Sequence, residues 1–414
     1  MALQITTSRP DPALLDLPWN TPLADWPGEI LAALPRGISR HVVRFVKVSG
    51  RILAVKEISK DLARREYTML RDLRRLDEPT VVPFGVVTGR RDAAGGRLDA
   101  CLLTRHLKFS LPYRALFSQT LRPDTASRLV DALAVLLVRL HLTGFYWGDV
   151  SLSNTLFRRD AGAFAAYLVD AETGELHPRL SNGQRAHDLQ LALVNIAGEL
   201  MDLQAGGLLH EDTDPVVIAN RIITRYEALW TELTGSEEFD TGERWRVEER
   251  IRRLNALGFD VGELAITTDI DGARITIQPK VVDAGHHSRR MLRLTGLDVG
   301  ENQARRLLND LDSFRAAHDR QADDESLVAH DWLTRVYEPI TRRVPRELAA
   351  KLEPPELFHE VLEHRWYLAE AVRHDIPLTE AIDDYVASVL PAKPDEQAVV
   401  GVDTIAMPVV IPDP

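Results

Sequence analysis

The first half of the chain alternates apolar and polar positions in a way that predicts several short strands around one helix. Ser49-Gly50, typical of a tight hairpin turn, separates the first two strand-like runs. Between residues 60 and 76 the apolar positions recur at helical spacing among many arginines. The strand-like runs are residues 41–48, 51–58, 81–88 and 100–104. This order predicts a small α+β lobe.

Helical periodicity dominates the rest of the chain. Leucines between residues 124 and 142 recur on one face, which predicts a core helix ending near Gly144. A second apolar helix is predicted from Asp188 to about Met201. Further helical patterns cover residues 216–233 and 243–257 and much of the chain to about residue 389.

Two segments interrupt this helical pattern. Residues 264–268 and 273–278 alternate around Ile270-Asp271-Gly272, which predicts a second β-hairpin. The first 35 residues are rich in proline and tryptophan and predict a packed lead-in with a short helix at residues 26–34.

Composition narrows the function classes. A chain of 414 residues is long enough for two domains, and its net charge of −12 disfavours indiscriminate binding to nucleic acid. No apolar stretch approaches the roughly 20 residues that a membrane span needs. The single cysteine, Cys101, cannot form an intrachain disulfide, and the N-terminal residues lack the pattern of a secretion signal. We therefore expect a cytoplasmic protein.

The most informative segment follows the helix that ends near Gly144. It contains Gly148-Asp149, then Asn154 five residues later, and then Asp170 and Glu172 at the end of an apolar strand. Upstream, Lys56 closes a strand in Ala54-Val55-Lys56, and Glu66 falls ten residues later on the predicted helix. Carboxylate and amide oxygens are the ligands that Mg²⁺ prefers in proteins, and a lysine ammonium can contact phosphate oxygens.

This arrangement resembles the protein-kinase-like superfamily, and the glycine before Asp149 is similar to its lipopolysaccharide-core kinase branch. The resemblance covers about residues 37–205. The rest is similar only to uncharacterised actinobacterial kinase-like proteins with a helical C-terminal extension. The implied fold is an α+β, bilobal protein-kinase-like fold, with a small antiparallel-sheet lobe and a helical lobe, followed by a mainly helical domain containing a β-hairpin.

The resemblance also implies roles and cofactors. Asp149 would be the catalytic base, with Lys56 and Glu66 as the ion pair that positions the phosphates of ATP. Mg²⁺ would be held by Asn154, Asp170 and Glu172. The adenine would meet the segment 102–107, with Leu103 and Arg105 as the nucleotide-binding candidates. Asp188 matches the aspartate that braces the catalytic loop in this superfamily.

Structural alternatives exist for the loop motif, Lys56, Glu66 and Asp188. The loop motif could be an Asx-rich turn followed by an ordinary strand end, Lys56 an outward-facing edge-strand lysine, and Glu66 part of a solvated helix face. Asp188 could instead be a helix N-cap, and His141 could cap the helix before Gly144.

The chain departs from conventional protein kinases at two places. No Gly-x-Gly-x-x-Gly loop precedes Lys56, where the nearest glycines are Gly37 and Gly50. The segment between Glu172 and Asp188 lacks the Ala-Pro-Glu end of a peptide-substrate activation segment. These departures disfavour a conventional Ser/Thr or Tyr kinase.

The leading functional hypothesis is therefore an ATP·Mg²⁺-dependent kinase that acts on a hydroxyl of a small-molecule or non-conventional acceptor. Two alternatives remain: a pseudokinase that binds nucleotide as a regulatory or scaffold protein, and transfer of AMP to protein. The helical second half is the candidate surface for a protein partner. The expected division is a lead-in (1–36), a kinase-like N-lobe (37–107), a kinase-like C-lobe (108–235), a mainly helical domain (236–392) and a proline-rich tail (393–414).

Two further patterns in the second half invite a binding function. Basic residues between His286 and Arg306 could bind an anion, although the acidic residues nearby favour a solvated helix face. His359 and His364 lie five residues apart, which places them about 140° apart around a helix, so we reject a zinc site.

Overall fold

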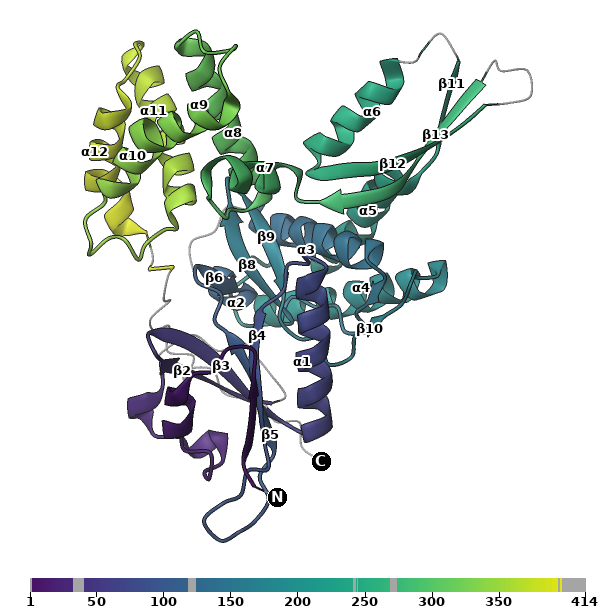
Figure 1. The fold of residues 1–414 in the computed structure, drawn as a ribbon, viewed down its shortest axis with the longest axis vertical. Helices are drawn as coiled ribbons and strands as arrows, with labels where there is room; N and C mark the ends of the chain where they lie inside the picture. Colours follow the sequence, from purple (N-terminus) through teal and green to yellow (C-terminus); the bar gives the residue numbers. More distant parts are fainter. Residues whose placement is uncertain are drawn as a thin grey trace.

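The computed structural model describes residues 2–32, 41–117, 124–240, 243, 245–268, 274–393 and 395–396. Its N-terminal lobe is a five-stranded antiparallel sheet with the order β1-β4-β5-β3-β2. The strands are β1 (Gln4–Thr7), β2 (Val42–Val48), β3 (Arg51–Ile58), β4 (Val82–Thr88) and β5 (Ala100–Arg105). Figure 1 shows this lobe at one end of the molecule, with the long helix α1 (Lys60–Arg75) alongside it.

Both faces of this sheet are covered. On one face, α1 buries a stripe that includes Tyr67 and Leu70. On the other, the lead-in buries Trp19 and Trp26 against the sheet. The lead-in forms three 3-10 turns, Pro12–Asp16, Leu23–Asp25 and Gly28–Ile30.

The packed lead-in differs from its prediction in two details. The helix expected at residues 26–34 is wrong, because Gly28–Ile30 is a single 3-10 turn and Leu31 bridges Val46 in an extended conformation. Residues 33 and 34 lie outside the described residues, as does Gly37. The edge strand β1 was not predicted, because four residues are too few to show a period.

The second lobe is mainly helical. Its helices are α2 (Tyr113–Phe117), α3 (Thr125–Leu142), α4 (Asn182–Ala205) and α5 (Pro215–Thr234). Its strands are β6 (Ser110–Pro112), β7 (Phe145–Tyr146), β8 (Thr155–Asp160), β9 (Ala163–Leu168) and β10 (Glu175–Leu176). The leucines of α3 form the centre of the core, and α5 and β9 pack against this helix.

The chain then forms a projecting β-rich unit and a compact helical unit (Figure 1). The first contains β11 (Glu237–Asp240), α6 (Trp245–Ala256), β12 (Phe259–Thr268) and β13 (Arg274–Ala284). The predicted turn at Ile270-Asp271-Gly272 and the first strand residue, Ala273, lie outside the described residues. β12 and β13 are longer than predicted and pair antiparallel, with a register irregularity near Glu263.

The compact helical unit has a hydrophobic core of its own, centred on Trp332 and Phe358. Its elements are α7 (His286–Thr295), α8 (Glu301–Ala317), α9 (Glu325–Trp332), a π-helical turn (Leu333–Tyr337), α10 (Glu338–Arg342), α11 (Pro354–Val372), α12 (Leu378–Ser388) and a 3-10 turn (Leu390–Ala392). The predicted fold class, an α+β bilobal kinase-like fold with a mainly helical extension that contains a hairpin, is confirmed. No helix in the described part of the chain is both long and apolar enough to cross a membrane.

Candidate active site

The pair Lys56 and Glu66 forms because both elements present these residues to the same space. Along β3, Leu53 and Val55 face the lead-in, so Lys56 points to the opposite face of the sheet, toward α1. Glu66 lies on the buried face of α1. The Lys56 Nζ atom lies 3.1 Å from Glu66 Oε2, and β3 runs between β2 and β5, so Lys56 is not on an edge strand.

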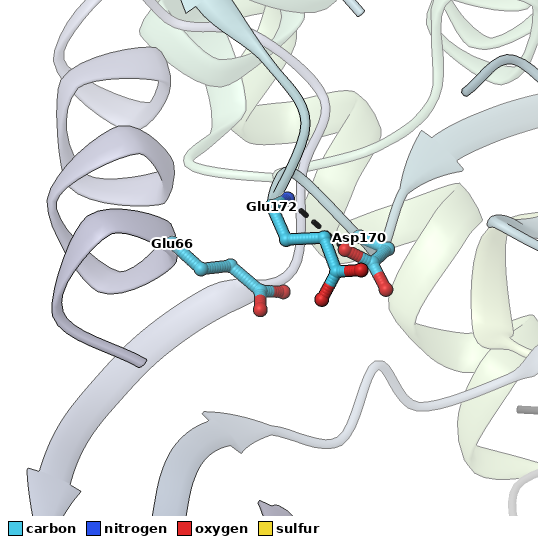
Figure 2. Close-up of side chains that lie close together, drawn as sticks. All are labelled: Glu66, Asp170 and Glu172. Atoms are coloured by element: carbon cyan, nitrogen blue, oxygen red, sulfur yellow. Dashed lines mark hydrogen bonds between the residues drawn. The ribbon is translucent and has the colours of Figure 1, made fainter. Parts of the chain in front are cut away.

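Lys56 also contacts the two carboxylates that follow β9. Its Nζ lies 2.6 Å from Asp170 Oδ2 and 3.3 Å from Glu172 Oε2. Figure 2 shows Glu66, Asp170 and Glu172 converging, with the Glu172 amide N–H donating to Asp170 Oδ1 at 3.0 Å. One oxygen from each of the three lies within 4.8 Å of the others, and no other trio of carboxylate, His or Cys ligands this close was found among the described residues.

Burial sets the electrostatics of this cluster. Burial and the nearby Asp170 carboxylate, against the opposing effect of Lys56, raise the pKa of Glu66 to about 8. Burial alone would lower the pKa of Lys56, but Glu66 and Asp170 raise it above its ordinary value, so the ammonium stays charged. A single ammonium cannot neutralise three carboxylates. The Nε2 atom of His41 also contacts Glu172 Oε2 at 3.3 Å, and the cluster can hold a further cation, either a proton on Glu66 or a metal ion.

Asp149 and Asn154 lie together on the loop before β8. The Asn154 side-chain amide donates to Asp149 Oδ2 at 2.9 Å and to the Asp149 carbonyl at 3.0 Å. Asn154 directly precedes β8, and the Val169 amide donates to its carbonyl at 3.1 Å. The pairing of β8 with β9 therefore places Asn154 opposite Val169, the residue directly before Asp170.

Asp188 holds the start of this loop from inside α4. Its fully buried carboxylate accepts from the backbone amides of Trp147 and Gly148, each at 2.8 Å. The N-cap alternative is wrong, because α4 begins six residues earlier and is capped by Ser181. His141 is not a helix cap either, because its buried ring contacts Asp188 at 3.1 Å and Tyr226 at 2.7 Å.

The backbone conformation before Asp149 explains why a glycine occupies position 148. Gly148 has a φ of 75°, a left-handed conformation that residues with a side chain adopt at a cost. A Cβ atom there would lie 3.2 Å from the Tyr146 ring. The loop thus turns so that the Trp147 and Gly148 amides both point at Asp188.

Two supports of the loop were missed in the sequence. Glu199 accepts from the amides of Leu152 and Ser153 at 2.8 and 2.9 Å, and the Asn195 side-chain amide donates to the Val150 carbonyl at 3.0 Å. Asp188, Asn195 and Glu199 are spaced by seven and four residues, which places them on one face of α4. That spacing of polar residues in an apolar helix was the available signal.

The nucleotide-binding candidates Leu103 and Arg105 occupy different positions on β5. Leu103 is buried in the core, with strands on both sides, and its ladder neighbours are Val55 and Gly85. Arg105 is the exposed last residue of the strand. In the segment 102–107, the backbone leaves the sheet after Arg105. Leu103 lies two residues before that point, inside the paired part of the strand.

The basic cluster of the second half is largely paired with carboxylates. His287 Nδ1 lies 2.6 Å from Glu301 Oε1, and Arg289 lies 2.5 Å from Asp260, which also contacts His286. These contacts fit a solvated, ion-paired surface. On α11, His364 contacts Asp384 at 2.6 Å, whereas His359 lies 3.8 Å from Glu363.

Two family models match the chain. Residues 46–197 match the lipopolysaccharide kinase (Kdo/WaaP) family, and residues 228–390 match a domain of unknown function, DUF4032. A search of the curated proteins found no match. Among solved structures, one described as "WaaP in complex with acyl carrier protein" aligns at a TM-score of 0.32 and 18% identity, over 56% of this chain and 100% of that one.

The first match confirms the predicted resemblance to the lipopolysaccharide-kinase branch of the protein-kinase-like superfamily. It spans all six candidate catalytic and metal-binding residues, Lys56, Glu66, Asp149, Asn154, Asp170 and Glu172. The second match covers the β-rich and helical units beyond the kinase-like lobes.

Proposed function

We propose that this protein is an ATP·Mg²⁺-dependent phosphotransferase that transfers the γ-phosphoryl group to a hydroxyl of a small molecule or another non-conventional acceptor. The observation that carries the proposal is the position of Lys56, which contacts Glu66 on α1 and Asp170 after β9 at the same time. This contact joins the two lobes where a nucleotide phosphate would need a cation. The match to the lipopolysaccharide kinase family supports the same reading.

The residues present fit a magnesium ion. Asp170 and Glu172 offer carboxylate oxygens that come within 4.8 Å of each other, and Asn154 offers an amide oxygen on the neighbouring segment. Mg²⁺ prefers such oxygen ligands. When bound, the ion would neutralise charge on the nucleotide phosphates. Lys56 would add a second positive charge, held in place by Glu66.

Asp149 is the candidate base for the acceptor hydroxyl. The Asn154 amide fixes one of its carboxylate oxygens, and Asp188 fixes the backbone immediately before it. A base held in this way keeps its orientation while it accepts the hydroxyl proton. The absence of a peptide-type activation segment favours an acceptor other than an ordinary protein serine, threonine or tyrosine.

Thermal unfolding with ATP, in the presence and absence of Mg²⁺, tests the nucleotide site first. At about 100 times the dissociation constant, ligand binding stabilises the native state by about 2.7 kcal/mol, a shift of several degrees. We expect a Mg²⁺-dependent rise in wild type and its loss in Asp170→Asn. Asp131→Asn is the matched control, because Asp131 makes an exposed ion pair with Arg221 on the C-lobe.

Transfer is then tested by incubating the protein with ATP·Mg²⁺ and pools of hydroxyl-bearing metabolites, with mass spectrometry of the products. Added phosphate supports the proposal, whereas added AMP on protein would replace it with AMP transfer. Nucleotide binding that is Mg²⁺-dependent but never accompanied by turnover would favour the pseudokinase alternative.

A further inference from the structure

The tip of the β8–β9 hairpin contacts the helical unit through Asp160, which is buried although Gly162 in the same turn is exposed. Asn154 precedes β8 and Asp170 follows β9 by two residues, so the base of this hairpin carries two of the proposed Mg²⁺ ligands. Figure 1 shows the opposite end of the hairpin reaching toward α7 and α8. The helical unit thus contacts the segment that connects the two candidate ligands.

Asp160 makes the central contact, because it caps a helix of the other unit. The N-cap residue of α8 is Gly300, which has no side chain to offer. The fully buried Asp160 carboxylate instead accepts from the backbone amides of Asn302 and Gln303, at 3.1 and 2.7 Å, which are two of the unpaired donors at the start of α8. The Asn302 side chain adds a third bond at 3.1 Å.

The contact between Asp160 and α8 leaves no room for a side chain at Gly300. A Cβ atom at this position would lie 2.5 Å from Asp160 Oδ1 and 2.8 Å from its Cγ. Real Cβ atoms do not approach oxygen so closely, so an alanine here would displace the Asp160 carboxylate. Asp160 therefore takes the place of the side chain that the N-cap residue lacks, and it can do so only because that residue is a glycine.

The turn itself is held in a conformation that would be unfavourable alone. Ala161 and Gly162 have φ values of 49° and 81°, and a left-handed alanine costs about 1 kcal/mol or more. The Ala161 amide donates to Glu356 Oε2 at 2.8 Å, and Glu356 is itself buried at the start of α11. On the β8 side of the turn, Arg158 pairs with Glu353 and Arg159 pairs with Glu396.

We propose that Asp160 is a positioning residue, through which the C-terminal helical unit holds the β8–β9 hairpin so that Asn154 and Asp170 meet Asp149 and Lys56 in the right geometry. This inference rests on the proposed phosphotransferase site. The six-residue strands span about 20 Å at roughly 3.3 Å per residue, and their continuous pairing transmits a tilt at the tip to the base. Asp149 and the loop up to Ser153 are held from α4, whereas Asp170 follows the far strand of the hairpin, so a tilted hairpin would move Asp170 relative to the base.

The coupling is tested without any ligand by hydrogen–deuterium exchange of the full-length chain. In Asp160→Ala and in Gly300→Ala, we expect faster exchange both at the tip and at the base, in peptides covering residues 149–156 and 166–172. Gly300→Ala displaces the carboxylate without removing a charge, so agreement between the two variants separates position from charge. Asp131→Ala is the control, because it removes a half-buried carboxylate of the same lobe that pairs with Arg221 and does not belong to the hairpin.

The effect on Mg²⁺ binding is measured by titrating Mg²⁺ at a fixed ATP concentration and following the melting temperature. Asp160→Ala and Gly300→Ala should require about tenfold more Mg²⁺, which corresponds to about 1.4 kcal/mol of binding free energy. Asp160→Asn, which keeps one acceptor oxygen, should lie between them and wild type. A merely structural contact would lower the melting temperature without moving this requirement.

The outcomes separate the two proposals. Faster exchange limited to the tip, or an unchanged Mg²⁺ requirement in folded variants, would overturn the positioning role and leave Asp160 as a docking contact. A wild-type protein without any Mg²⁺-dependent shift would overturn the proposed function, while the exchange data would still decide whether tip and base are coupled. If Asp160→Ala does not fold, Gly300→Ala and Asp160→Asn carry the test.

Discussion

Replacing Glu66 by glutamine should change how the stability of the protein depends on pH. The pKa of Glu66 is raised from 4.5 to about 8, chiefly by burial. Between these values the folded state binds a proton that the unfolded state does not. Stability from this group is therefore greatest at low pH and falls as the pH rises toward 8.

The size of the effect follows from the shift. At 1.36 kcal/mol per pKa unit, a shift from 4.5 to about 8 corresponds to at most about 5 kcal/mol, and coupling to Lys56 and Asp170 brings the expected value to about 2–4 kcal/mol. Lys56 does not offset this loss. Its own raised pKa gives stability that is fully present below the ordinary lysine pKa and is lost only at much higher pH.

Urea unfolding, followed by tryptophan fluorescence at intervals from pH 5 to pH 8.5, measures the effect. The free energy of unfolding of wild type minus that of Glu66→Gln should fall by about 2–4 kcal/mol across this range. Glu175→Gln, on the exposed β10, is the control and should follow wild type. Parallel curves for wild type and Glu66→Gln would refute the reasoning that burial keeps Glu66 protonated near neutral pH.

Three further predictions concern the loop that carries Asp149. Asp188→Ala leaves the buried amides of Trp147 and Gly148 without an acceptor, so chemical denaturation should show a loss of about 3–5 kcal/mol. Gly148→Ala forces a side chain into a left-handed conformation against Tyr146, so it should cost about 1–2 kcal/mol in the same assay and reduce transfer more than nucleotide binding. Asp149→Asn should abolish transfer in a product assay while the Mg²⁺-dependent thermal shift with ATP persists; a variant with full turnover would remove Asp149 from the role of base.

The sequence pattern predicted the elements that a period or a spacing encodes. The leucines of α3 and the arginine-rich face of α1 have clear helical periods, and both helices lie within two residues of their predicted bounds. The spacing from Asp149 to Asn154 predicted a shared loop, and the structure places the two side chains in contact. Short elements such as β1 carry too few residues for a period to appear.

Other features depend on contacts between distant segments, which no local pattern encodes. The start of α4 was predicted at Asp188, yet the helix begins at Asn182 after the N-cap Ser181, whereas Asp188 contacts the loop as the resemblance implies. The resemblance places the adenine against the segment 102–107, and the pairing of β5 with β3 and β4 shows where in that segment the strand ends, at Arg105. The burial of Asp160 in a second unit was likewise invisible, because an aspartate beside Ala161-Gly162 reads as an ordinary turn residue.

The candidate site is assembled from three separate supports, each with its own buried polar contacts. The N-lobe supplies Lys56 through its hydrogen bond to Glu66, and α4 fixes the Asp149 loop through Asp188. The helical unit fixes the far end of the β8–β9 hairpin through Asp160. Buried carboxylates are costly unless they are bonded, so each support favours one position of its segment. A change in the docking of any one would shift the proposed metal ligands against the base, which makes the helical unit part of the site's architecture even though none of its residues needs to touch the nucleotide.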